Sequence, residues 1–339
     1  MMKGKTNAGL IIIAVFFLAI MAGVAPVASA EWSNVKNIVA EPWLKVSDDP
    51  HVALEGLAFD REGNLFVSSI WTGEIWKISP DKKMTSIFKD PRVPQCSSIV
   101  VHKDGRLFLC TLLDGKIVSI KPDGSDYKEI LTKLPLLEAF VPDDGVFDSE
   151  GNYYFTNIVG SPAKPVGGIY RISADLKKVD LVQGDLAAPN GIDIATGTYG
   201  KETRLLVTEH AANRLMRIDL LPDKVTPMMH VLGLGVAAYF HGYGPDSARI
   251  DEAGNLYICS YKGGRIFVMA TADSYFEPVA QILTPGRDKG VQREVPSVVI
   301  KPGTDEGYMT VASHGKEGEG AWIMKFKALG NARTPYSHQ

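Results

Sequence analysis

The sequence predicts an all-β protein, and three observations support this prediction. Short apolar runs rich in Val, Ile, Phe and Tyr alternate with polar residues, which is typical of β-strands. Turn-forming residues separate these runs, and the chain of 339 residues holds 33 Gly and 20 Pro, which indicates many tight turns. The third observation is an internal repeat, and its period decides the architecture.

Each copy of the repeat begins with a polar residue, and the regular copies reach a turn residue five positions later and continue into an apolar run. The clearest copies are residues 55–66, 143–154 and 246–257, and three less regular copies bring the number to six. The starts, spaced by 42 to 56 residues, are Glu55, Ser97, Asp143, Asn190, Asp246 and Ser297. A repeat of about 40 to 50 residues built from four short strands is typical of a propeller blade. Because one blade cannot bury its own faces, the sequence predicts a six-bladed β-propeller that forms a single domain over residues 31–339.

Three segments outside the repeat carry their own expectations. A propeller ring is commonly closed by a strand from one chain end, and we expect residues 36–44 to complete the last blade. Residues 160–167, which hold two prolines and two glycines, are expected to form a loop on the rim. Residues 232–243, rich in Gly, Ala and aromatic side chains, are interpreted as a lid over the channel mouth or as a plain connecting loop.

The N-terminus resembles a targeting segment rather than part of the fold. Lys3 and Lys5 precede an apolar run over residues 10–24, and Ala28-Ser29-Ala30 matches a small-residue cleavage pattern. This arrangement predicts a secretory signal peptide over residues 1–30 and a periplasmic or secreted protein without stable membrane insertion after cleavage. An uncleaved membrane anchor is the alternative, since the run from Gly9 to Val27 is nearly long enough to span a bilayer.

The net charge argues against a nucleic-acid binder, and the cysteine count limits the possible disulfides. The formal net charge of -3 lacks the basic footprint of a nucleic-acid binder. The chain has three cysteines, Cys96, Cys110 and Cys259, and an odd number leaves at least one without a partner in the chain. We expect all three to be buried free thiols. Nothing in the sequence indicates an oligomeric state.

The first position of each repeat predicts a functional site. The first strand of each propeller blade lines the central channel, so equivalent positions in successive blades converge on one axis. Three of these positions are carboxylates (Glu55, Asp143 and Asp246) and one is an amide, Asn190. A single acid at the start of a strand is more often a turn residue, but carboxylates converging at one register repel each other unless a cation is bound. An all-oxygen ligand set suits Ca²⁺, with Mg²⁺, Mn²⁺ or Zn²⁺ as substitutes.

Several distinctive stretches resemble the senescence-marker/gluconolactonase/luciferin-regenerating family, and within it the bacterial drug-responsive lactonases. The matching stretches are residues 55–60, 102–108, 143–148, 207–215, 244–247 and 282–288. The resemblance covers nearly all of the chain after residue 50 and implies a propeller that hydrolyses lactones.

Carried over residue by residue, the resemblance also implies a ligand set. The metal ligands of the family fall on Glu55, Asn190 and Asp246, and the lactonase subgroup adds Asp143 and Ser247. The acid/base residue of the family falls on Asp246. A second, structural calcium of the subgroup is not expected here, because residues 133–140 lack the Asp of that site and place Glu138 where its Thr would be.

These residues imply metal-assisted hydrolysis of a small lactone. The cation would polarise the lactone carbonyl, and Asp246 would take a proton from the attacking water and return it to the departing alkoxide. Glu209, His210 and His241 are alternative proton carriers, although such residues are more often structural. The G-x-S-x-G elbow of serine hydrolases is absent from the sequence.

Two other functions remain open at this stage. One is a quinone-dependent sugar or alcohol dehydrogenase, and the other is a non-catalytic binding propeller with a structural cation. For the lactonase, aromatic residues near the expected channel mouth favour a partly apolar substrate. These residues are Trp71, Tyr239, Phe240 and Tyr243.

Overall fold

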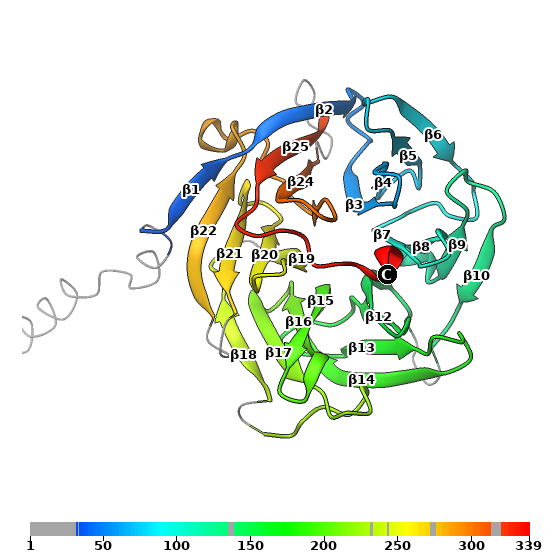
Figure 1. Cartoon of the computed structure of the whole chain (residues 1–339), viewed down its shortest axis with the longest axis vertical. Coiled ribbons are helices and arrows are strands. Elements are labelled where there is room, and N and C mark those ends of the chain that lie inside the picture. The colour runs from blue at the N-terminus through cyan, green and yellow to red at the C-terminus, as the bar shows by residue number, and fades with distance from the viewer. Residues whose placement is uncertain are drawn as a thin grey trace, which may run out of the picture. The chain divides into compact units, whose positions relative to one another are not determined.

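The computed structural model confirms the six-bladed β-propeller (Figure 1). It describes residues 32, 34–134, 139–230, 233–242, 244–271, 276–312 and 320–339, so the predicted leader lies outside the described residues. Lys36–Gln339 form one compact unit. In the described part of the chain, six sheets contain all 25 named strands, and no helix is long and apolar enough to cross a membrane.

The blades follow one another along the chain in the order that the repeat predicts. Blade one contains β3 (Leu54–Phe59), β4 (Leu65–Ser69), β5 (Ile75–Ile78) and β6 (Met84–Phe88). Blade two contains β7 (Ser98–Val101), β8 (Leu107–Cys110), β9 (Ile117–Ile120) and β10 (Lys128–Leu131). Blade three contains β11 (Pro142–Phe147), β12 (Tyr153–Asn157), β13 (Gly167–Ile172) and β14 (Val179–Leu186).

The second half of the ring repeats this plan. Blade four contains β15 (Pro189–Gly197), β16 (Gly200–Glu209), β17 (Arg214–Asp219) and β18 (Leu234–Tyr239). Blade five contains β19 (Pro245–Ile250), β20 (Asn255–Ser260), β21 (Arg265–Ala270) and β22 (Glu277–Leu283). Blade six contains β23 (Val298–Ile300), β24 (Glu306–Val311) and β25 (Ala321–Lys327), together with β2 (Glu41–Ser47) from the N-terminal side.

The hydrophobic core lies between blades rather than within them. Leu57 and Val67 of blade one, for example, belong to one buried cluster with Ile323 of blade six. Each blade therefore depends on its neighbours for burial, which is why the repeat is stable only as a closed ring. The three cysteines are free and buried, as the sequence predicts.

The N-terminal strands close the ring differently from the expectation. β2 pairs antiparallel with β25 and completes blade six, but β1 (Lys36–Val39) pairs parallel with β22 and becomes a fifth strand of blade five. The Ala40 amide donates to the Leu283 carbonyl at 2.9 Å, which continues this pairing to the end of β1. The prediction that residues 36–44 all join the last blade was therefore wrong for residues 36–39, and the segment ties two blades together.

The interpretation of residues 232–243 as a lid or plain loop was also wrong. Residues 234–239 form β18, which pairs with β17 as the outer strand of blade four. Every residue of this strand is half-buried or exposed, so its sequence lacks the alternation by which the inner strands are recognised. Residues 232 and 243 lie outside the described residues.

The C-terminal segment crosses the centre of the ring, a feature that the sequence repeat does not predict (Figure 1). Arg333 donates to Glu202 at 2.9 Å and to Asp193 at 3.2 Å. The Tyr336 ring lies 5.2 Å from His102 and 5.5 Å from Phe147. Ala332 forms a bridge with Asp251, at the turn end of β19 and away from Asp246, so the segment covers the channel end opposite the predicted site.

We expect Tyr336→Ala to destabilise the protein by about 2 kcal/mol, because the truncation removes ring contacts to His102 and Phe147. Denaturant unfolding measures the change. Tyr336→Phe keeps the ring and serves as the control, with an expected loss below about 0.5 kcal/mol. Equal stability of the alanine variant and the wild type would show that the segment does not stabilise the hub.

Candidate functional site

Four of the five predicted ligands occupy the same place in their blades. Glu55, Asp143, Asn190 and Asp246 are each the second residue of a first strand, in β3, β11, β15 and β19. Their exposed fractions lie between 5% and 7%. Polar side chains at such burial lose hydration, so their surroundings must compensate for that loss.

A β-bulge marks each of these four positions. The pairing of first and second strands shifts register between Leu54 and Leu57 in blade one and between Pro142 and Gly145 in blade three. Blades four and five shift in the same way, after Pro189 and Pro245. The pairing of blade two is regular from Ser98 onward, whereas blade six also shifts by one residue between the Glu294–Ala312 bridge and the Val298–Met309 pair. Because a bulge redirects a side chain, the four predicted ligands share one local backbone geometry.

Two glycines allow neighbouring first strands to approach each other closely at the bulges. A Cβ atom on Gly56 would lie 2.6 Å from the Ile99 amide nitrogen, and one on Gly191 would lie 2.4 Å from the Asp246 carbonyl oxygen. Both distances are shorter than a side chain tolerates, so only glycine fits. Backbones of successive blades are therefore in direct contact where the predicted ligands lie.

Hydroxyl groups fix the backbone of the site from one blade to the next. Ser97 Oγ donates to the Asp143 carbonyl at 2.9 Å. Thr156 Oγ1 donates to the Asn190 carbonyl at 2.6 Å, and Thr208 Oγ1 donates to the Asp246 carbonyl at 2.8 Å. In each case the donor belongs to the preceding blade, so these bonds hold the site residues in a common ring.

The three carboxyl groups interact electrostatically. Burial, with repulsion from Asp246 and Asp143, holds the pKa of Glu55 well above its usual value. Burial and the Asp143 carboxylate likewise raise the pKa of Asp246, while a hydrogen bond from the Asn190 side chain opposes the rise. Burial and neighbouring Asp144 raise the pKa of Asp143 to about 7. The side chains of Glu55, Asp143, Asn190 and Asp246 therefore form one interacting group at the hub.

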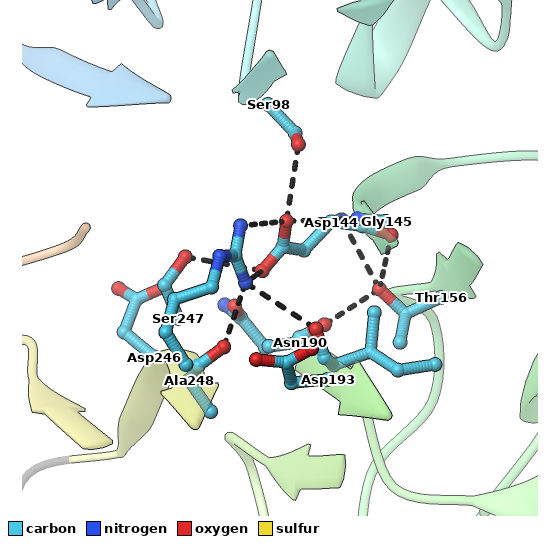
Figure 2. Close-up of polar contacts among 12 residues, drawn as sticks. Ser98, Asp144, Gly145, Thr156, Asn190, Asp193, Asp246, Ser247 and Ala248 are labelled. Atoms are coloured by element: carbon cyan, nitrogen blue, oxygen red, sulfur yellow. Dashed lines mark hydrogen bonds and ion pairs between the residues drawn. The ribbon is translucent and has the colours of Figure 1, made fainter. Parts of the chain in front are cut away.

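A buried ion pair lies beside this group, and sequence reasoning missed it (Figure 2). Arg249 Nη1 and Nη2 donate to the two carboxylate oxygens of Asp144 at 2.8 and 2.9 Å. The fifth predicted ligand, Ser247, donates through Oγ to Asp144 at 3.2 Å. The sequence shows each member separately, as the doubled acid Asp143-Asp144 and as an arginine inside the first strand of blade five, but it does not show that the two pair.

The alternative proton carriers have different surroundings. Glu209 is fully buried, accepts a hydrogen bond from the Ala187 amide at 2.6 Å and pairs with Arg214, so its carboxylate is engaged in the scaffold. His241 is exposed. The His210 ring lies 5.9 Å from the Tyr261 ring, and burial lowers the pKa of His210. A Cβ on Gly244 would lie 2.7 Å from the His210 ring, so this histidine packs against the chain two residues before Asp246.

The donor set fits a hard divalent cation. Carboxylate oxygens, an amide and a hydroxyl are the ligands that Ca²⁺ prefers. A cation would offset the burial and the mutual repulsion that raise the pKa values of the three carboxyl groups. Among the described residues, no group of three or more His, Cys, Asp or Glu side chains forms a metal-binding cluster by itself. The fit rests on the mixed set, to which Asn190 contributes. Glu138, from the region of the second calcium site of the subgroup, lies outside the described residues.

Comparison with known proteins identifies the family. Residues 53–282 match the model described as "SMP-30/Gluconolactonase/LRE-like region". The chain belongs to this family. The resemblance inferred from the sequence is thereby confirmed, and the matched range contains all five predicted ligands.

Relatives within the family carry a named activity. The chain is 38% identical to "Lactonase drp35" of Staphylococcus saprophyticus over 92% of this chain and 94% of that protein. It is 36% identical to the protein of the same name from Staphylococcus haemolyticus, over 91% and 93% of the two chains. The prediction that this family member is a lactonase is confirmed by these relatives.

Solved structures agree on the fold. A luciferin-regenerating enzyme superposes with a TM-score of 0.71 at 20% identity, over 89% of this chain and 99% of that chain. A calcium-binding regucalcin from Agrobacterium tumefaciens superposes with a TM-score of 0.68 at 16% identity, over 88% and 98% of the two chains. At these identities the likeness shows a shared propeller.

The raised pKa of Asp143 predicts how stability depends on pH when metal is removed. Between its ordinary pKa of 3.8 and the folded value of about 7, the folded state binds more protons at this group than the unfolded state, so its contribution to stability is lost as the pH rises. In EDTA we expect Asp143→Asn to raise the Tm at about pH 7.5 by several degrees and to change it little near pH 4. Scanning calorimetry in EDTA at both pH values measures the difference. An equal Tm change at the two pH values would contradict the assignment.

Proposed function

We propose that the protein is a calcium-dependent lactone hydrolase, with the cation bound at the hub by Glu55, Asp143, Asn190, Asp246 and Ser247. The observation that carries this proposal is the grouping of three buried carboxyl groups and one amide at the bulged starts of four first strands. Family membership and the lactonase names of its relatives give the reaction class. The likeness to regucalcin, which is described as a calcium-binding protein, supports the choice of metal.

The bound cation would supply Lewis acidity toward the lactone carbonyl oxygen. The residues of the chain have separate tasks. Asp246 takes a proton from the attacking water and later returns it to the departing alkoxide, so that the ring-opened product leaves as a hydroxy acid. The Asn190 side chain lowers the pKa of Asp246 and so partly opposes the rise that burial and Asp143 cause. Glu55 and Asp143 contribute negative charge to the cation site. Because the site is buried, the attraction between these carboxylates and a cation is stronger than it would be in water.

The channel mouth favours lactones with an apolar portion. Trp71 and Tyr239 are 49% and 62% exposed, whereas Phe240 is 3% exposed and packs against Phe267 with ring centroids 5.2 Å apart. Phe240 is therefore core material rather than a substrate contact. Tyr243 lies outside the described residues. Tyr239 ends the outer strand β18, so it lies at the rim of the propeller and not at the channel mouth. We propose that Trp71, in the connection between β4 and β5, offers apolar surface to the substrate.

Asp246→Asn tests the assigned acid/base role. The amide keeps the size of the side chain but cannot accept the proton, so kcat for lactone hydrolysis should fall by about 10²- to 10⁴-fold. Ser297→Ala is the control, because Ser297 is a buried residue directly before the first strand of blade six whose hydroxyl has no hydrogen-bond partner among the described residues; its kcat should stay within about twofold of the wild type. Activity of the asparagine variant at the wild-type level, with calcium bound in titration calorimetry, would refute the role of Asp246.

Chelation tests the metal requirement and the substrate class together. Hydrolysis is measured over aldonolactones, aromatic lactones and acyl-homoserine lactones, with and without EDTA. We expect EDTA to remove at least about 99% of the activity and added Ca²⁺ to restore it, because the carbonyl then regains its Lewis acid. Aromatic or long-chain lactones should give the higher kcat/KM. Turnover that is unaffected by EDTA would refute the calcium-dependent mechanism.

The same preparation tests the alternative chemistry. A quinone-bound sugar dehydrogenase superposes with a TM-score of 0.63 at 13% identity, which is a likeness of fold alone. A quinone cofactor absorbs visible or near-ultraviolet light and supports dye reduction by sugars. Hydrolysis by a calcium-loaded preparation without such absorbance would favour the lactonase over the dehydrogenase.

A further inference from the structure

Two adjacent buried aspartates at the hub have opposite surroundings. Asp143 and Asp144 follow each other in the bulge of β11, and both are buried. Asp143 belongs to the group of mutually repelling carboxyl groups, where its pKa is raised. Asp144 is held by an arginine and by several other hydrogen-bond donors (Figure 2). The different surroundings indicate that Asp143 and Asp144 have different roles.

The hydrogen bonds of Asp144 use its full acceptor capacity. Oδ1 accepts from Ser98 Oγ at 3.0 Å, from the Gly145 amide at 2.8 Å and from Arg249 Nη2 at 2.9 Å. Oδ2 accepts from Arg249 Nη1 at 2.8 Å and from Ser247 Oγ at 3.2 Å. A carboxylate offers about four lone-pair positions, and five donors already occupy them. Asp144 consequently has no acceptor position left for a cation.

Arg249 joins three blades at this point. Besides the paired bonds to Asp144 of blade three, Nη1 donates to the Ile192 carbonyl of blade four at 3.3 Å and to the Ala248 carbonyl of its own blade at 2.7 Å. The planar guanidinium is suited to such paired recognition of a carboxylate. A buried pair of this kind is costly to break on one side only, because a buried charge then remains unpaired.

Ser247 connects the ion pair to the predicted cation site. Its hydroxyl proton is used in the bond to Asp144, so the lone pairs of its oxygen are left to accept a cation. The Ser247 amide donates to the Pro296 carbonyl at 3.2 Å, which fixes the backbone of the same residue toward blade six. The orientation of this ligand thus depends on Asp144 being held in place.

We propose that Arg249 is a positioning residue that commits Asp144 to the scaffold, so that Asp143 alone supplies the blade-three carboxylate to the cation and Ser247 presents its oxygen lone pairs. This inference rests on the proposed function, since it presumes the calcium site. It assigns Arg249 no contact with the substrate. It specifically predicts that substitution of Asp143 and substitution of Asp144 have different effects on metal binding, although the two residues are adjacent and chemically identical.

The test compares Asp143→Asn with Asp144→Asn in the full chain. Ca²⁺ affinity is measured by titration calorimetry, and the Eu³⁺ excitation spectrum reports the total charge of the bound ligands. Asp143→Asn should weaken Ca²⁺ binding by about 100-fold or more and shift the Eu³⁺ line, because a charged ligand is lost. Asp144→Asn should weaken binding by no more than about tenfold and leave the Eu³⁺ line unchanged, as expected for a group that acts through others.

The variant Arg249→Met provides a second, independent test of the positioning role of Arg249. Removing the guanidinium frees lone pairs on Asp144, so the Eu³⁺ line should shift toward a more negatively charged ligand set. The double variant Asp144→Asn with Arg249→Met should return the line to its wild-type position. If Arg249→Met does not fold, as judged by circular dichroism, the comparison of the two aspartates decides alone.

The outcomes separate this inference from the function on which it rests. Equal losses of Ca²⁺ affinity in Asp143→Asn and Asp144→Asn would overturn the positioning role while leaving the calcium site intact. An Eu³⁺ line unchanged by Arg249→Met in a folded protein would overturn it as well. A wild-type protein that binds neither Ca²⁺ nor Eu³⁺ would overturn the proposed function itself, and the inference with it.

Discussion

The close approach of neighbouring first strands at the hub is the constraint on which the site depends. Gly56 and Gly191 leave no room for a side chain between adjacent backbones, and hydroxyls of one blade hold carbonyl groups of the next. This contact brings acids from distant parts of the sequence into one electrostatic group despite the cost of their burial and mutual repulsion. The interblade hydrophobic core supplies the stability that offsets this cost.

The six equivalent positions of the ring do not have the same role. The first strands carrying Glu55, Asp143, Asn190 and Asp246 are all irregular at that residue and carry an acid or an amide there. The pairing of blade two is regular from Ser98 onward, and Ser97 donates to the Asp143 carbonyl. A ring of six similar units thus divides into positions that form the site and positions that support it.

The parts predictable from sequence were those encoded in the repeat. The six copies of the repeat predicted the number of blades. The common register of Glu55, Asp143 and Asp246 predicted the grouping of acids, because a propeller places equivalent residues around one axis. The bulges were not predictable in this way, since they depend on pairing between strands. The Asp144–Arg249 pair was missed because an arginine in a strand carries no signal of its partner 105 residues away. β18 and β1 were misassigned because half-exposed outer strands lack a strong apolar pattern.

The C-terminal segment affects access to the hub of the propeller. Arg333 and Tyr336 lie across the end of the axial passage that is remote from Asp246, with a cavity of about 120 Å³ between this segment and the inner strands. Because this segment lies across that end of the hub, we expect a lactone to reach the predicted site, and the opened acid to leave it, from the opposite face.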